Sequence, residues 1–324
     1  MISNEAYRAA HEAAVLADHA GRGMLRLSGK TRLELIHRMS TQAVNGLKGG
    51  EGAATVLTTD IGRIIDRILL YATSDAVYVL TGEGHADALA RYFLRNVFFN
   101  DDFQLEDLSA QTVVFGIYGP RAGEMLAAAG FPEVMLPLHH WREAQIGGAT
   151  AYLHRADPIA GDGYLVTANA DDREAVWAAL VAAGLTPIDD AAYDYLRIEA
   201  GRPRFGRELT LDYIPLEAGL WDDVSFHKGC YTGQEIIARM ESRGKLAKRL
   251  VRLQPRPDRS ATSGRAETYQ VLPGTEIVAG DRPAGTITSA AEGPAGLLAL
   301  GYVKTTVLDQ GAELLAGDVR LSVM

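Results

Sequence analysis

One short segment carries the residue types best suited to covalent chemistry, including the only cysteine in 324 positions. Its residues are Lys228, Gly229, Cys230, Tyr231, Thr232, Gly233, Gln234 and Glu235. A thiolate is a strong nucleophile and a metal ligand, and a nearby cation favours it over the thiol. We therefore identify Cys230 as the candidate catalytic residue and Lys228 as the charge that activates it.

The residues after Cys230 predict a helix that would support this role. Thr232 followed by Glu235 is a capping-box pattern, so we expect a helix from about Gly233. The positive end of its dipole would then face Cys230 and add to the field of Lys228. The alternative is an inert thiol in the core, because free cysteine is among the most buried residue types, and the cysteine taken alone would favour this alternative.

The octapeptide resembles the signature K-G-C-[FY]-x-G-Q-E of the YgfZ family, a branch of the glycine-cleavage T-protein (aminomethyltransferase) superfamily. Three other segments resemble superfamily motifs in the same order along the chain. Residues 57–66 resemble the hairpin L-x-x-x-G-x-I-x-D, residues 197–203 resemble R-x-E-A-G-x-P, and residues 215–220 resemble P-x-E-A-G-L. The resemblance therefore covers nearly the whole chain.

This resemblance implies that tetrahydrofolate, or a one-carbon derivative of it, binds in a channel between two lobes. It implies that Glu199 accepts hydrogen bonds from the pterin ring, and hydrogen bonds to a charged group contribute about 1.5–3 kcal/mol each. A carboxylate at the end of a helix is otherwise unfavourable, which also favours a ligand or an arginine partner there. Other residues expected to line the channel are Arg197, Trp221, Tyr164, Arg155 and Asp60.

For function, the YgfZ resemblance implies a folate-binding accessory protein that supports iron–sulfur cluster assembly or repair through Cys230. Its partners would be iron–sulfur client enzymes or cluster-assembly proteins. The alternative is a tetrahydrofolate-dependent aminomethyltransferase or demethylase, in which Cys230 has no role. The position expected for the transferase carboxylate is Ala88, next to Asp87, and residues 221–228 lack the arginine expected of a transferase. A thiol hydrolase is a third hypothesis, with His227 as the candidate base.

Composition narrows the classes of function. With 32 basic and 41 acidic residues the net charge is −9, which argues against strong nucleic-acid binding. We find no run of ~18 apolar residues, so we expect no membrane segment. A single cysteine cannot form an intrachain disulfide, which favours a reducing compartment such as the cytoplasm. The eight histidines show no spacing typical of a metal site, and no metal is expected.

The elements that must position these residues form an α+β pattern. Amphipathic periodicity predicts helices over 5–19, 31–39, 86–93, 121–129, 171–183 and 189–199, with strands and hairpins between them. From residue 245 onward only short β-branched runs remain, at 251–253, 276–278, 286–288 and 297–303, with a linker at 255–264. We expect a T-protein-like region over 1–244, with two interleaved ferredoxin-like or antiparallel-sheet lobes, and a small β-barrel over 245–324.

Overall fold

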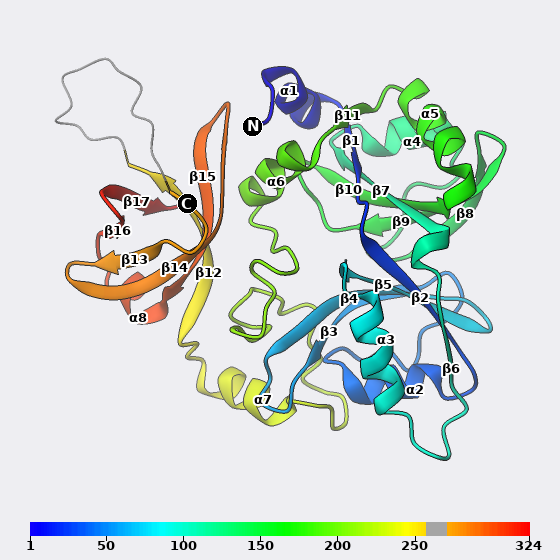
Figure 1. The fold of residues 1–324 in the computed structure, drawn as a ribbon, viewed down its shortest axis with the longest axis horizontal. Helices are drawn as coiled ribbons and strands as arrows, with labels where there is room; N and C mark the ends of the chain where they lie inside the picture. Colours follow the sequence, from blue (N-terminus) through cyan, green and yellow to red (C-terminus); the bar gives the residue numbers. More distant parts are fainter. Residues whose placement is uncertain (257–270) are drawn as a thin grey trace.

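The computed structural model describes residues 1–256 and 271–324, which form two sheet-based lobes and a barrel (Figure 1). Each lobe is a single sheet with helices packed on one face. The lobes lie one above the other in this view, and the barrel lies beside them. The predicted α+β class, with two mainly antiparallel lobes and a C-terminal barrel, is confirmed.

The lower lobe in Figure 1 is a five-stranded antiparallel sheet. In spatial order its strands are β3 (Gly52–Thr58), β4 (Ile64–Ala72), β5 (Ala76–Glu83), β2 (Arg22–Ser28) and β6 (Gln104–Asp107). Two helices, α2 (Arg32–Met39) and α3 (Ala86–Arg95), cover its outer face. Buried side chains of these helices, among them Leu35 and Phe93, pack against alternate strand residues and form the core of this lobe.

The upper lobe is a six-stranded sheet in which one strand pair is parallel and the others are antiparallel. In spatial order its strands are β11 (Thr186–Ile188), β1 (Val15–Asp18), β7 (Thr112–Gly119), β10 (Asp162–Asn169), β9 (Ala149–Ala156) and β8 (Trp141–Ile146). Helices α4 (Ala122–Ala129) and α5 (Arg173–Ala182) cover its outer face. Two single turns of 3-10 helix, η1 (Ser109–Gln111) and η2 (Ala170–Asp172), lead into β7 and α5.

The inner faces of the two sheets pack against each other. Met24, Leu69 and Leu80 of the lower sheet meet Val114 and Leu165 of the upper sheet in one apolar cluster. Because alternate residues of a strand point to opposite faces, each sheet buries one face under helices and the other against its partner. The chain enters the upper sheet with β1, passes to the lower sheet with β2 and later returns to the upper sheet with β7, so the two lobes are interleaved along the chain.

The first predicted helix, over 5–19, is wrong in its second half. Helix α1 spans Asn4–Glu12, and residues 15–18 form strand β1. Val15 and Leu16 are fully buried, and β1 pairs with both β7 and β11. The alanine-rich sequence favours a helix locally, but a strand in the middle of a sheet satisfies its backbone groups on two sides, so tertiary pairing overrides propensity.

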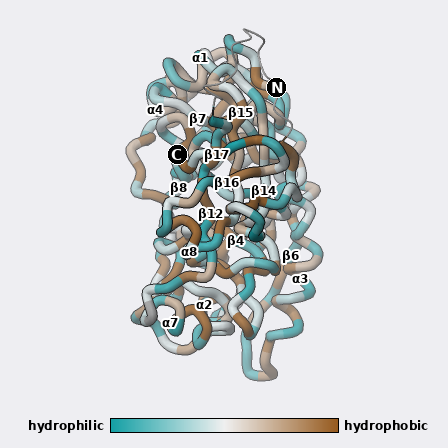
Figure 2. Tube along the Cα trace, turned by 90° about the vertical axis from the view of Figure 1, so that its left-hand side faces the viewer, coloured by the Kyte–Doolittle hydropathy of each residue, from teal (hydrophilic) through white to brown (hydrophobic). Residues whose placement is uncertain are grey.

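The barrel closes on itself through six strands. In order around the barrel they are β12 (Lys248–Pro255), β15 (Gly296–Lys304), β14 (Arg282–Gly293), β13 (Glu276–Ala279), β16 (Leu314–Ala316) and β17 (Val319–Val323), with helix α8 (Thr305–Asp309) after β15. Helix α6 (Asp190–Glu199) packs against β14 and β15 and ties the barrel to the upper lobe. In Figure 2, barrel strands β12, β14 and β16 lie near mid-height, with α1 near one end of the molecule and α7 (Gln234–Arg243) near the other.

Two further predictions concern the linker at 255–264 and the absence of a membrane segment. Residues 257–264 of the predicted linker lie outside the described residues. Within the described ranges, no helix is long and apolar enough to cross a membrane.

Candidate functional site

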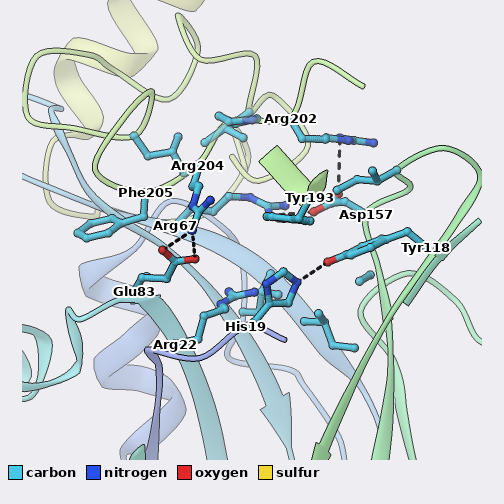
Figure 3. Close-up of a pocket in the computed structure, with 18 residues that line it drawn as sticks. His19, Arg22, Arg67, Glu83, Tyr118, Asp157, Tyr193, Arg202, Arg204 and Phe205 are labelled. Carbon is cyan, nitrogen blue, oxygen red and sulfur yellow. Dashed lines mark hydrogen bonds and ion pairs between the residues drawn. The ribbon is translucent and has the colours of Figure 1, made fainter. Parts of the chain in front are cut away.

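The two lobes and the segment that leads to the barrel enclose a cavity of about 130 Å³, here called the central cavity (Figure 3). This volume is close to the ~150 Å³ that admits a benzene ring in an engineered core, so it suits a flat head group rather than a whole large ligand. Its polar and aromatic lining residues are His19, Arg22, Arg67, Glu83, Tyr118, Asp157, Tyr193, Arg202, Arg204 and Phe205.

The charges in the central cavity are arranged as ion pairs. Arg67 Nη1 lies 2.8 Å from Asp157 Oδ2, and Arg204 Nη2 lies 2.7 Å from Glu83 Oε2. Burial by itself would raise the pKa of Asp157, but Arg67, together with His139 and Arg202, lowers it below its usual value. Asp157 is therefore an ionised hydrogen-bond acceptor at neutral pH.

Aromatic side chains form the other walls of the central cavity. Tyr118 and Tyr193 are stacked with their ring centroids 5.6 Å apart, and His19 packs edge-on against Tyr193 at 4.6 Å. His19 Nε2 lies 2.8 Å from the Tyr118 hydroxyl. Burial, helped by Arg22 and Arg204, lowers the pKa of His19 to about 3, so its imidazole is neutral. These walls suit a flat ring system.

One buried donor in the central cavity lacks a hydrogen-bond partner within the described part of the chain. It is Nη1 of Arg204, which lies 3.6 Å from Asp194 Oδ1, beyond hydrogen-bond distance, while the other terminal nitrogen, Nη2, is bonded to Glu83. A buried donor left without a partner costs about 1–3 kcal/mol, which a ligand carbonyl or ring nitrogen would recover. The cavity therefore offers a flat, polar ring one donor that lacks a hydrogen bond and one ionised acceptor, Asp157.

Glu199 does not line the central cavity. It ends helix α6 as predicted, but its carboxylate accepts a hydrogen bond of 2.8 Å from the Tyr7 hydroxyl. His11 Nε2 lies 2.9 Å from the other carboxylate oxygen. Burial and the bond to Glu199 raise the pKa of Tyr7 to about 12, so the hydroxyl remains a donor. The unfavourable end of α6 is thus compensated by helix α1.

Arg197 is also outside the central cavity, although Arg202 of the same motif lines that cavity. Only 1% of its side chain is exposed, and its guanidinium contacts Asp194, Glu208 and Ser289 at 2.5–2.7 Å. These partners come from helix α6, from the segment that follows it and from strand β14 of the barrel. The contacts that the structure shows for Arg197 therefore hold the barrel to the upper lobe.

The other predicted channel residues are scattered, and none of them lines the central cavity. Trp221 is 43% exposed and lines a groove beside the barrel. The Tyr164 hydroxyl donates to the carbonyl of Val134, and the guanidinium of Arg155 lies 4.5 Å from the Tyr164 ring centroid. Asp60 is exposed at the turn between β3 and β4, where it accepts from the N–H of Ile61.

Asp87, the candidate for the transferase carboxylate, lies in the first turn of α3 and is exposed. Its side chain forms an ion pair with Arg91 one helical turn further on. It is not among the residues that line the central cavity. The carboxylates that do line it, Glu83 and Asp157, come from strand β5 and from the residue after β9.

The octapeptide packs against the β3–β4 hairpin, so two motifs that resemble the same superfamily meet in space. The hydroxyl of Thr58 donates a 2.6 Å hydrogen bond to the carbonyl of Thr232. Helix α7 follows at Gln234, close to the predicted start, but the predicted capping box is wrong. Gly233 is the N-cap, no side chain of the described residues caps the helix, and Glu235 pairs with Arg239 in the next turn.

Cys230 is exposed on this segment and does not line the central cavity. The Lys228 ammonium donates to the backbone carbonyls of His37, Ser40 and Gln42 near the C-terminal end of α2. An ammonium has three donors, so none remains for a hydrogen bond to Cys230. Burial lowers the pKa of Lys228 to about 8, which leaves the amine mostly protonated at neutral pH. These three hydrogen bonds of Lys228 hold the segment that carries Cys230 against the end of α2.

Replacing Gly233 by alanine is expected to destabilise the fold by about 2–3 kcal/mol. Its φ of 82° lies in the left-handed region, which costs a non-glycine residue roughly 1–2 kcal/mol. In addition, a Cβ would lie 2.5 Å from the carbonyl oxygen of Thr59 on the hairpin. Gly219→Ala is a matched control, since its φ is 78° and a Cβ there would meet no atom of residues 1–256 or 271–324 within 4 Å. Urea denaturation of both variants measures the difference, and equal losses would contradict the proposed close contact.

Sequence reasoning missed the residues of the central cavity. Arg67 interrupts the buried strand β4, and Glu83 ends the largely buried strand β5. A charged residue in an otherwise apolar strand is the signal that would have indicated them, because charges are buried only with partners. Asp157, Arg202 and Arg204 lie in loops and carry no comparable signal.

Comparison with known proteins gives a direct family match. Residues 1–228, more than half of the chain, match the profile of the GCVT N-terminal domain family. The chain belongs to this family. The match confirms the T-protein superfamily that the motifs indicated.

Other GCVT relatives support the assignment. An aminomethyltransferase of Symbiobacterium thermophilum is 31% identical over 258 residues, which cover 74% of this chain and 67% of the relative. A chloroplast protein of Arabidopsis thaliana, named as a candidate transferase, is 28% identical over 97% of this chain and 71% of its own length. The crystal structure of the glycine cleavage system aminomethyltransferase T of Bartonella henselae has the same fold, with a TM-score of 0.83, 23% identity, and coverage of 98% of this chain and 87% of that one.

Proposed function

We propose that this GCVT-family protein binds a reduced folate in the central cavity and transfers a one-carbon unit between an aminomethyl donor and that folate. The observation that carries the proposal is the lining of the cavity. It combines an aromatic wall, the ionised carboxylate of Asp157 and an arginine N–H without a hydrogen bond among the described residues, as a polar bicyclic ring requires. Relatives named as aminomethyltransferases support the reaction class.

The residues of the cavity have distinct roles in this proposal. Asp157 Oδ2 faces Arg67, whereas Oδ1 lies 3.7 Å from Arg202 and remains able to accept an N–H from the ligand. Arg204 Nη1 donates to an acceptor on the ring. Tyr193 and Tyr118, which stack on each other, form one wall of the cavity against which the ring would lie. When bound, a reduced folate accepts the one-carbon unit on two nitrogens, whose two protons leave with ammonia and the donor's carrier group.

Support of iron–sulfur clusters in client enzymes is the second candidate, and the position of Cys230 favours it. The thiol is exposed on a segment that Lys228 and the hydrogen bond from Thr58 to Thr232 hold against the lower lobe, and it is not among the residues lining the central cavity. A thiol placed in this way can contact another protein without competing with a bound folate. The resemblance of the octapeptide to the YgfZ signature supports the same candidate.

The two candidates are separated by replacing Cys230 with alanine, which leaves the central cavity intact. The transfer proposal expects the variant to match the parent in loss of 5,10-methylenetetrahydrofolate, measured in the reverse reaction with ammonium and a dithiol carrier. The cluster proposal expects a folded, tetrahydrofolate-binding variant that fails to restore iron–sulfur enzyme activity in cells lacking the native protein. If the parent protein binds no tetrahydrofolate, both proposals are wrong.

For location, we propose a reducing compartment such as the cytoplasm. The single, exposed cysteine supports it, since such a thiol persists most readily where disulfides are kept reduced.

A further inference from the structure

A second cavity, of about 510 Å³, lies at the interface of the two sheets and shares no lining residue with the central cavity. We call it the aromatic cavity. Along strand β9 the side chains of Tyr152, His154 and Ala156 share one face; the first two line the aromatic cavity and the third lines the central cavity. The two cavities therefore occupy different ends of the same interface, and the volume lies within the range of small-molecule sites, about 300–1,000 Å³.

The walls of the aromatic cavity are formed by rings from both lobes. Tyr71 and Tyr78 come from the lower sheet, and Trp141, Tyr152 and His154 come from the upper sheet. Trp141 packs edge-on against Tyr152 with ring centroids 5.8 Å apart, and Tyr71 lies 3.9 Å from His154. The indole N–H of Trp141 donates to the carbonyl of Ala72, which fixes the ring in place.

The charge of the aromatic cavity is opposite in character to that of the central cavity. No lysine or arginine is among the described residues that line it, whereas four arginines line the central cavity. Its charged lining residues are Glu143 and Asp172, and neither makes an ion pair within residues 1–256 and 271–324. Burial lowers the pKa of His154 to about 3, so this imidazole adds no positive charge. The cavity is thus electronegative.

His154 also provides an unused polar atom. Its Nε2 lies 3.0 Å from the hydroxyl of Thr167, while Nδ1 is buried and has no hydrogen-bond partner among the described residues. Such an atom costs free energy unless a ligand or a water molecule reaches it. Met24, Leu108 and Ala168 supply apolar surface on the lining. Rings, apolar surface and unpaired carboxylates therefore meet in one cavity.

We propose that the aromatic cavity binds a small organic cation with an alkylated ammonium group. The faces of Trp141, Tyr152 and Tyr78 would attract the positive charge, as aromatic rings do for quaternary ammonium groups. Glu143 and Asp172 would balance the charge, and the apolar residues would contact the alkyl groups. A neutral ligand of the same shape would gain the apolar contacts but not the electrostatic ones. This site is independent of folate binding in the central cavity.

The test uses the full chain and two probes of matched shape, choline and its neutral analogue 3,3-dimethylbutan-1-ol, titrated by calorimetry at constant ionic strength. We expect choline to bind at least about tenfold more tightly than the alcohol, which corresponds to 1.4 kcal/mol of cation–π and charge attraction. Equal affinities, or no saturable binding of choline up to about 10 mM, would overturn the proposal.

Variants locate the binding site. Trp141→Leu is expected to weaken choline binding by about tenfold. Glu143→Gln, at an exposed position where folding is not at risk, is expected to weaken it by about threefold while leaving the alcohol unaffected. Trp221→Leu removes a tryptophan from a different groove and should leave choline binding unchanged. Choline binding that survives both Trp141→Leu and Glu143→Gln would place the cation elsewhere and refute the proposed site.

Discussion

Replacing Arg197 by methionine is expected to lower the free energy of unfolding by about 3–5 kcal/mol, because it leaves buried carboxylates without their counter-charge. Arg197 Nε lies 2.7 Å from Asp194, and Nη1 lies 2.7 Å from Glu208, whose side chain is fully buried. Ser289 of the barrel accepts from Arg197 and donates to Glu208. The variant removes the centre of this network and keeps much of the apolar volume.

The matched control is Arg249→Met, which removes an arginine from an exposed pair. Arg249 lies 3.5 Å from Asp309, and both side chains are about half exposed or more. Such a pair contributes about 0–1 kcal/mol, so this variant should unfold close to the parent. Denaturant titrations of the two variants provide the comparison. If Arg197→Met lost no more stability than the control, the network would not stabilise the fold. The role of Arg197 would then be the one that the motif resemblance implies, in folate binding.

The sequence was informative wherever a local pattern decided the outcome. The C-terminal barrel follows from short β-branched runs between glycine and proline turns, and the runs at 251–253, 276–278, 286–288 and 297–303 all lie within barrel strands. Helix α6 begins where Asp189 caps it and ends at Glu199, as predicted. These features depend on residues close together in sequence, where periodicity and capping are readable.

The residues that contact the candidate site residues could not be predicted from local sequence patterns. The octapeptide and the β3–β4 hairpin were each recognised, but their contact, from Thr58 to Thr232, joins residues far apart in the chain. The position of Glu199 at a helix end was correct, while its partners Tyr7 and His11 belong to the first helix. A motif specifies a residue type and a local backbone, and only the packing of the lobes determines which cavity a side chain reaches.

This distinction gives the folate proposal its sharpest test. Asp157→Asn is expected to weaken tetrahydrofolate binding by about 10- to 150-fold. A hydrogen bond to a charged acceptor contributes about 1.5–3 kcal/mol, and the substitution removes that charge. The substitution preserves shape, and Arg67 keeps its second partner, Asp223 Oδ2, at 2.6 Å, so the fold should persist. Anaerobic calorimetry with tetrahydrofolate measures the affinity, and circular dichroism checks the fold.

Glu199→Gln is the comparison variant for the same experiment. The motif resemblance assigns the contact with the pterin ring to Glu199, whereas the geometry of the central cavity favours Asp157. Glu199 binds Tyr7 and His11 and does not line the central cavity, so its replacement should leave the affinity for tetrahydrofolate close to that of the parent. The opposite result, with affinity lost in Glu199→Gln and kept in Asp157→Asn, would place the folate against helices α1 and α6. Arg204 and Tyr193 would then have no role in binding it, and the central cavity would need a different ligand.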